Sequence, residues 1–213
     1  MKTWSKSDLV LFWQYIKAGW QVMRTAYVIR TQLSKSVVTI LGSSQLPQDS
    51  VYADQAYALA QKLTSRGYSI VTGGGPGIMK AANCGAQSAG NKTPKTLGIG
   101  VDGIDEGFTS GCGLSIRVSQ FFGRQWLLMR YSCAFVFFPG GIGTMDEFFE
   151  LLTACKHGYV KRVPIILVGT HFWQPIVDWY AQALANNYIV KDHDELFYVT
   201  DDPDHILIHC KKG

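Results

Sequence analysis

A segment near the middle of the chain combines glycines, a threonine and carboxylates in a spacing that suits anion binding. It reads Pro139-Gly140-Gly141-Ile142-Gly143-Thr144-Met145-Asp146-Glu147 and follows the apolar run 134–138. Glycines allow backbone N–H groups to approach a ligand closely, and a helix that starts at Thr144 would add unpaired N–H groups and the positive end of its dipole. A strand, a glycine turn and a helix start together bind an anion, most often a phosphate. Glu147 would lie one turn inside this site, where phosphate binding alone does not require a carboxylate.

Two further apolar runs end in small residues that suit a ligand site. Gly42-Ser43-Ser44 follows the run 36–41, and Gly73-Gly74-Gly75-Pro76-Gly77 follows the run 68–72. In a doubly wound sheet, ligands bind outside the carboxyl ends of the strands, so we expect the three loops along one edge. Neither glycine-rich loop fits the dinucleotide fingerprint or the P-loop, because Lys80 and Asp146 stand at the sixth position and neither loop contains Gly-Lys-Ser/Thr. The sequence therefore disfavours a dinucleotide dehydrogenase and an NTPase.

The elements that must position these loops alternate between strand and helix patterns. Near-continuous apolar runs alternate with helical patterns, which predicts an α/β fold with a doubly wound parallel sheet and helices on both faces. The predicted strands cover residues 36–41, 68–72, 96–101, 114–118, 134–138, 163–168 and 196–199. The predicted helices cover residues 7–31, 52–66, 78–89, 119–132 and 172–185, with further helices from 144 and from 203.

The first predicted helix carries an apolar, aromatic stripe. Its members recur at three- and four-residue steps: Leu9, Phe12, Trp13, Ile16, Trp20, Met23 and Tyr27. We interpret the stripe as a face that packs on the domain or on a partner subunit. The alternative is a basic helix on a membrane surface, but few basic residues are clustered tightly enough to favour it. We do not expect membrane attachment.

Composition and charge limit the class of protein. The chain has 213 residues, of which 47% are hydrophobic and 17% charged, and this fits one α/β domain with a sizeable core. Six basic residues and one acidic residue fall in the first 35 positions, so the rest is near neutral and no nucleic-acid partner is expected. The cysteines are odd in number and form no C-x-x-C pair, which predicts a reduced, cytoplasmic protein without a disulfide framework. We expect no signal peptide and no spanning helix, because polar residues interrupt the N-terminal apolar run.

The two glycine motifs together resemble a known family. Gly73-Gly74-Gly75-Pro76-Gly77-Ile78-Met79 and the later segment 139–147 are similar to the LOG ("Lonely Guy") family, the cytokinin riboside 5′-monophosphate phosphoribohydrolases formerly labelled possible lysine decarboxylases. The resemblance covers residues 36–200 and implies a Rossmann-like fold over residues 36–213, preceded by a helical extension, residues 1–35. It also implies a homodimer that hydrolyses the N-glycosidic bond of a nucleoside 5′-monophosphate to free base and ribose 5-phosphate, with no metal and no cofactor.

The resemblance also implies particular site residues. It makes Arg124 and Glu147 catalytic and gives the 5′-phosphate to the P-G-G-x-G-T turn. The expected substrate-binding residues are Gly42, Ser43, Ser44, Gly74, Gly75, Met79, Pro139, Gly140, Gly141, Gly143 and Thr144. Gln45 and Gln125 stand where the family usually has Arg and Lys, and each change removes a positive charge near the expected phosphate or base.

Glu147 has two interpretations. A carboxylate against the ribose can stabilise the cationic transition state or deprotonate the attacking water. The spacing from Thr144 to Glu147 also matches a capping box, in which the glutamate bonds back to the helix N-cap. The alternative function is a non-catalytic nucleotide- or cofactor-binding protein on the fold of molybdenum-cofactor carriers. Lys80 as the Schiff-base lysine of a pyridoxal enzyme has no further support in the chain.

Overall fold

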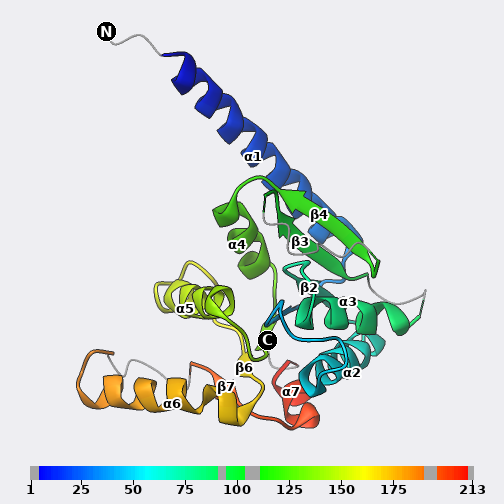
Figure 1. The fold of residues 1–213 in the computed structure, drawn as a ribbon, viewed down its shortest axis with the longest axis vertical. Helices are drawn as coiled ribbons and strands as arrows, with labels where there is room; N and C mark the ends of the chain where they lie inside the picture. Colours follow the sequence, from blue (N-terminus) through cyan, green and yellow to red (C-terminus); the bar gives the residue numbers. More distant parts are fainter. Residues whose placement is uncertain (1–4, 91–94, 104–110, 190–195, 211–213) are drawn as a thin grey trace.

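Within residues 5–90, 95–103, 111–189 and 196–210, which the computed structural model describes, seven parallel strands form one sheet (Figure 1). They are β1 (Val37–Leu41), β2 (Ser69–Thr72), β3 (Leu97–Val101), β4 (Leu114–Val118), β5 (Ala134–Phe137), β6 (Ile165–Leu167) and β7 (Tyr198–Val199). Their order is β4-β3-β2-β1-β5-β6-β7, and every pairing is parallel. The order reverses between β1 and β5, which is therefore the topological switch point where ligands bind in such sheets.

Side chains of the central strands are buried on both faces of the sheet. Phe135 and Phe137 of β5 point into one core, whereas Ala134, Val136 and the following Phe138 point into the other. All five are buried. Burial on both faces explains why the strands read as continuous apolar runs in the sequence.

Two layers of helices provide this cover. The first core includes residues of α1 (Lys6–Gln32), α4 (Phe121–Arg130), α5 (Ile142–Lys156) and α6 (Thr170–Ala185). The second includes residues of α2 (Val51–Ser65), α3 (Ile78–Ser88) and α7 (Pro203–Cys210). The predicted doubly wound fold with helices on both faces is confirmed, and the predicted elements agree with the observed ones to within a residue or two. Between β3 and β4, residues 104–110 lie outside the described part of the chain.

The helix α1 packs on the body through its C-terminal half. Ala18, Ala26 and Ile29 are buried there, and Val22 lies against Gly123 of α4. The Gln21 side-chain oxygen accepts hydrogen bonds from the Ser119 N–H and hydroxyl, at 2.9 and 2.7 Å. The N-terminal half projects away from the sheet (Figure 1). The division of the chain at residue 35 stays a prediction.

The packing face of α1 differs from the predicted one. The seven side chains of the aromatic stripe are 43–70% exposed, so the interpretation that they pack on the domain is wrong. Small residues face the body instead, because Ala18 and Ala26 let the helix approach α4 and β4 closely. The interpretation that the stripe packs on a partner subunit stays a prediction.

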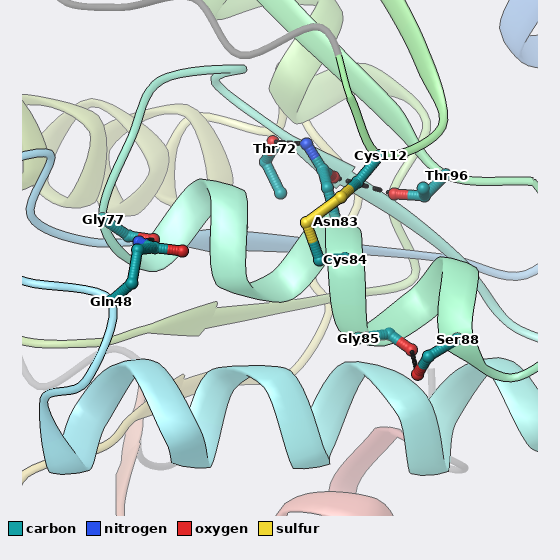
Figure 2. The surroundings of a disulfide bond; sticks show 9 residues. All are labelled: Gln48, Thr72, Gly77, Asn83, Cys84, Gly85, Ser88, Thr96 and Cys112. Carbon is teal, nitrogen blue, oxygen red and sulfur yellow. Dashed lines mark hydrogen bonds between the residues drawn. A yellow bond between two sulfur atoms is a disulfide. The ribbon is translucent and has the colours of Figure 1, made fainter.

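Two cysteines form a disulfide, which corrects the expectation of unpaired thiols. Cys84 of α3 is bonded to Cys112, which precedes β4, and their Cα atoms are 4.8 Å apart (Figure 2). The pair is distant in sequence, but β2, β3 and β4 are neighbours, so α3 and the approach to β4 come together. Beside the disulfide, Asn83 donates a hydrogen bond to Thr72 and accepts one from Thr96. This network joins α3 to the loops around β2 and β3.

Candidate active site

A cavity of about 380 Å³ opens where the carboxyl ends of β1, β2, β3 and β5 meet. It lies at the switch point of the sheet, and its volume suits a small-molecule ligand. Its walls come from the loops after β1, β2 and β5, from the end of β3, and from α4 and α5. The lining residues are Gly42, Ser43, Ser44, Gln45, Gly73, Gly75, Met79, Gly100, Val101, Phe121, Arg124, Gly141, Ile142, Gly143, Thr144 and Glu147.

The structure brings most of the predicted site residues together in this cavity. Both expected catalytic residues line it, and so do eight of the expected binding residues: Gly42, Ser43, Ser44, Gly75, Met79, Gly141, Gly143 and Thr144. The three loops also contact one another. The Ser43 N–H donates to the Pro139 carbonyl at 3.0 Å, and the Ile78 N–H donates to the Ser43 carbonyl at 3.1 Å.

Three predicted binding residues support the loops from behind and do not line the cavity. Gly74 lies against Gly98 of β3, where an added Cβ on Gly98 would come within 2.8 Å of the Gly74 Cα. Gly140 lies beneath the Thr144 side chain. Pro139 packs against Gly169 and offers its carbonyl to Ser43. Their contacts are with protein atoms, which makes them supports of the cavity wall.

Five lining residues were not predicted. Gly73 belongs to the quoted glycine motif, and Gly100 and Val101 end a predicted strand whose carboxyl end faces the same edge. Those three could have been found from the position of the strand ends. Phe121 and Ile142 carry no comparable signal, because an apolar side chain at a helix start more often packs inside.

Arg124 and Glu147 form an ion pair inside the cavity. The Arg124 Nη1 donates to the Glu147 Oε1 at 2.7 Å, and both side chains are about nine-tenths buried. The Arg124 Nε donates to the Ile99 carbonyl at 3.0 Å. The guanidinium lies directly over Gly73, where a Cβ would overlap the Nη2 atom. The hydrogen bonds to the Glu147 carboxylate and to the Ile99 carbonyl therefore hold the Arg124 guanidinium in place, and Gly73 leaves the space that the guanidinium fills.

The protonation of Glu147 is set by opposing effects. Burial raises the pKa of the Glu147 carboxyl above its ordinary value, while the charge and the hydrogen bond of Arg124 lower it. The neighbouring negative charge of Asp146 raises the pKa further. Burial outweighs the arginine, so Glu147 keeps its proton to a higher pH than an exposed glutamate. Arg124 favours the ionised form that a general base needs.

The start of α5 bears on one of the two interpretations of Glu147, the capping box. The helix begins at Ile142 with Gly141 as its N-cap, two residues earlier than predicted, and no side chain caps it. The capping-box interpretation is therefore wrong, because Thr144 lies inside the first turn and the Glu147 carboxylate pairs with Arg124. Gly141, Ile142 and Gly143 line the cavity, so the unpaired N–H groups of the helix N-terminus adjoin it.

The two glutamines that replace basic family residues have different surroundings. Gln125 is buried behind the cavity, and its Nε2 donates to the Asp146 Oδ2 at 2.7 Å. Gln125 does not line the cavity, and the effect of its missing positive charge on a bound phosphate or base stays a prediction. Gln45 does line it.

Lysines and groups of metal-binding side chains are the other candidates for chemistry among the described residues. None of their lysines lines the cavity, Lys80 of α3 included, so the geometry gives no support to a Schiff-base lysine. Within the same residues, no group of three His, Cys, Asp or Glu side chains could hold a metal ion. None of the helices described here combines the length and apolar character needed to cross a bilayer.

A doubly wound parallel sheet with a ligand cavity at its switch point defines a Rossmann-like α/β protein. Over residues 79–210 the chain matches the family described as possible lysine decarboxylase. This match covers more than half of the chain, which therefore belongs to that family. The resemblance to the LOG family drawn from the two glycine motifs is confirmed.

Curated relatives carry the LOG activity in their names. The cytokinin riboside 5′-monophosphate phosphoribohydrolase LOG of Oryza sativa subsp. japonica is 28% identical over 147 residues, which are 66% of this chain and 58% of the rice protein. The match thus spans less than two thirds of the rice protein. The cytokinin riboside 5′-monophosphate phosphoribohydrolase LOG5 of Arabidopsis thaliana is 27% identical over 169 residues, 76% of this chain and 71% of that protein.

Solved structures share the fold. The molybdenum cofactor binding protein from the phototrophic bacterium Rippkaea orientalis superposes with a TM-score of 0.60 at 19% sequence identity. The superposition covers 83% of this chain and 96% of that chain. At this identity the likeness establishes the fold alone.

Proposed function

We propose that the protein hydrolyses the N-glycosidic bond of a nucleoside 5′-monophosphate to free base and ribose 5-phosphate. The observation that carries the proposal is the buried Arg124–Glu147 pair, which shares one cavity with the N-terminus of α5. The helix N-terminus supplies a seat for the 5′-phosphate, and the carboxylate supplies a negative charge for the sugar. The activity named for the curated relatives supports an AMP-like or cytokinin riboside monophosphate as substrate.

The proposed reaction follows from these positions. As the bond between C1′ and the base nitrogen lengthens, its electron pair moves to the base and positive charge builds on the ribose. The Glu147 carboxylate stabilises that charge and takes a proton from the water that adds to C1′. The proton that Glu147 takes up ends on the departing base, so the sugar gains the hydroxyl of the water, the base gains its proton and Glu147 is ionised again.

Arg124 acts in this scheme by holding Glu147. Its Nε and Nη1 donate to the Ile99 carbonyl and to Glu147, and its Nη2 lies against Gly73. These contacts fix the guanidinium beside the carboxylate and favour the ionised form of Glu147. In this scheme the first turn of α5 binds the 5′-phosphate, and Arg124 does not.

A substrate panel tests the proposal. The purified chain is incubated with nucleoside 5′-monophosphates that differ in base, including an isopentenylated adenosine monophosphate, and with the matching nucleosides. Liquid chromatography with mass spectrometry then follows free base and ribose 5-phosphate. We expect base release from at least one monophosphate and slower release, by roughly 100-fold, from its nucleoside, because phosphate binding energy is lost. Failure to turn over any monophosphate would contradict the proposal.

A second candidate function is the binding of a nucleotide or phosphorylated cofactor without turnover. Gln45 favours it, because this uncharged side chain lines the cavity where the family resemblance leads us to expect an arginine. The candidate predicts that a phosphorylated ligand raises the melting temperature and is recovered intact by mass spectrometry. The presence of Arg124 and Glu147 as a pair favours hydrolysis over this candidate.

A further inference from the structure

Three buried polar side chains form a hydrogen-bonded network behind the cavity. Asn83 of α3 donates from its Nδ2 to the Thr72 hydroxyl at 2.9 Å, and its Oδ1 accepts from the Thr96 hydroxyl at 2.8 Å (Figure 2). Each of the three residues is at most 3% exposed, and none of them lines the cavity. Buried polar groups that are paired in this way hold the segments they join in one arrangement.

This network lies where the pairing of β2 with β3 ends. The two strands are paired as far as Thr72 and Gly98. The Thr72 hydroxyl also accepts from the Gly74 N–H at 3.1 Å, so it holds the glycine loop as well as Asn83. Gly98 makes room for both, because an added Cβ there would lie 2.8 Å from the Gly74 Cα and 3.3 Å from the Asn83 Nδ2. Asn83 therefore holds two neighbouring strand ends together where their own pairing stops.

The next residue of each strand holds the Arg124 guanidinium. Gly73, directly after Thr72, leaves the space that the Arg124 Nη2 fills. Ile99, directly after Gly98, accepts a hydrogen bond from the Arg124 Nε at 3.0 Å through its carbonyl. Both contacts thus lie one residue beyond the strand ends that the buried network holds. A change in the spacing of these strand ends would change the space in which the guanidinium lies.

The helix that carries Asn83 is anchored independently of this network. Cys84 is bonded to Cys112, which ties α3 to the approach to β4 (Figure 2). Gly85 packs against the backbone of Tyr57 in α2, where an added Cβ would overlap the Tyr57 carbonyl. Loss of the Asn83 amide should therefore leave α3 in place and release only the strand ends.

We propose that Asn83 is a positioning residue for the hydrolysis: by holding the ends of β2 and β3 together, it keeps the Arg124 guanidinium beside the Glu147 carboxylate. Asn83 reaches the ion pair only through these strand ends, because its side chain does not line the cavity. The effect on turnover rests on the proposed function. The effect on Arg124 and Glu147 does not, because the ion pair is present whatever the cavity binds.

The ionisation of Glu147 reports on the position of Arg124. Burial and the charge of Asp146 raise the pKa of the Glu147 carboxyl, whereas the charge and the hydrogen bond of Arg124 lower it. Glu150, one turn further along α5, is a second carboxyl nearby. A guanidinium that moves away lowers the Glu147 pKa less, so this pKa should rise when the network is broken.

Matched substitutions test the proposal. Asn83→Ala removes both side-chain hydrogen bonds. Thr72→Val keeps the shape of its side chain but removes the hydroxyl to which Asn83 donates, whereas Thr72→Ser keeps that hydroxyl. Ser69→Ala is the control for lost stability, because it removes a buried hydroxyl that accepts a backbone hydrogen bond at the other end of β2. Carbon NMR of the glutamate-labelled full chain follows the Glu147 titration, and Glu147→Gln identifies the signal.

The two network-breaking variants, Asn83→Ala and Thr72→Val, should raise the midpoint of the Glu147 titration by about one unit. In both, kcat for the monophosphate should fall by roughly 10- to 100-fold with a smaller change in KM, because the phosphate is bound by α5. Thr72→Ser and Ser69→Ala should titrate and turn over like wild type. An unchanged midpoint in Thr72→Val, or an equal rise in Ser69→Ala, would overturn the proposal. If wild type releases no base, the proposed function fails, and the titration alone decides the role of Asn83.

Discussion

At the scale of single residues, the site depends on how the Glu147 carboxyl is buried beside the Arg124 guanidinium. Arg124 lies 2.7 Å from its carboxylate, and Gly73 leaves the space that the guanidinium occupies. A residue without a side chain thus determines where the Arg124 charge can lie. Asp146 adds a negative charge beside the pair and is itself held by Gln125.

Gly73→Ala should displace the Arg124 guanidinium without unfolding the protein. The added methyl group would overlap Nη2, which is the mobile end of a long side chain. We expect kcat for the monophosphate to fall by roughly 100-fold, because the carboxylate loses its fixed partner. Steady-state kinetics measures this, and a melting curve checks the fold. Gly19→Ala, where an added methyl meets no atom within 4 Å, is the control. Unchanged kcat in Gly73→Ala would refute the positioning of Arg124.

Asp146→Asn should move the acid limb of the pH–rate profile to lower pH. Glu147 must be ionised to act as a base, and burial raises its pKa above the ordinary value, with a further rise from the charge of Asp146. Activity is therefore lost as the pH falls through this raised value. Removing the Asp146 charge lowers the Glu147 pKa, so the limb should shift down by less than about one unit. The asparagine oxygen can still accept from Gln125. Asp49→Asn, on an exposed turn, should leave the limb unchanged. A shift to higher pH would contradict the assignment.

At the scale of helices and strands, the sequence predicts most elements, because burial on one or both faces leaves a regular pattern of apolar residues. The apolar runs of β1, β2 and β5 predict strands that are buried on both faces. The glycines that follow these strands indicate the edge of the sheet where the cavity lies. The start of α5 was misplaced because Thr144 is a good N-cap residue, whereas the structure caps the helix with Gly141. The residue at which α5 begins depends on how the three loops pack together, and the local sequence does not contain that information.

The disulfide between α3 and the approach to β4 was missed for a related reason. Spacing shows neither how close Cys84 and Cys112 come nor that β4 lies at the sheet edge beyond β3. Only the tertiary fold brings the two thiols into range. The burial of Gln125 against Asp146 belongs to the same class, because it depends on how α4 meets α5.

Reduction of the Cys84–Cys112 disulfide should destabilise the protein. The bond closes a loop with a sequence separation of 28, and opening such a loop costs about 3 kcal/mol of unfolding free energy. Dithiothreitol should therefore lower the melting temperature of wild type by several degrees, as measured by circular dichroism. Cys84→Ser/Cys112→Ser should melt at the lower temperature with or without the reductant. If dithiothreitol lowers the melting temperature of this double variant as much as that of wild type, the Cys84–Cys112 bond is not the cause of the loss of stability, and the prediction is contradicted.

At the scale of the whole molecule, helix α4 links the cavity to helix α1. Helix α4 carries Arg124 and Phe121 into the cavity, contacts α1 through Gly123, and exposes Phe122. The apolar periodicity of α1 predicts a helix correctly. It does not show whether the aromatic stripe packs against the same chain or against another molecule.

The most direct test of the proposed function is turnover of nucleoside 5′-monophosphates by wild type and by Glu147→Gln. Glutamine keeps the size of the side chain and can accept the hydrogen bond from Arg124, but it carries no charge and takes no proton. We predict that wild type releases free base and ribose 5-phosphate and that Glu147→Gln is slower by at least roughly 1,000-fold with an unchanged melting temperature. Equal turnover by the two proteins would contradict the account.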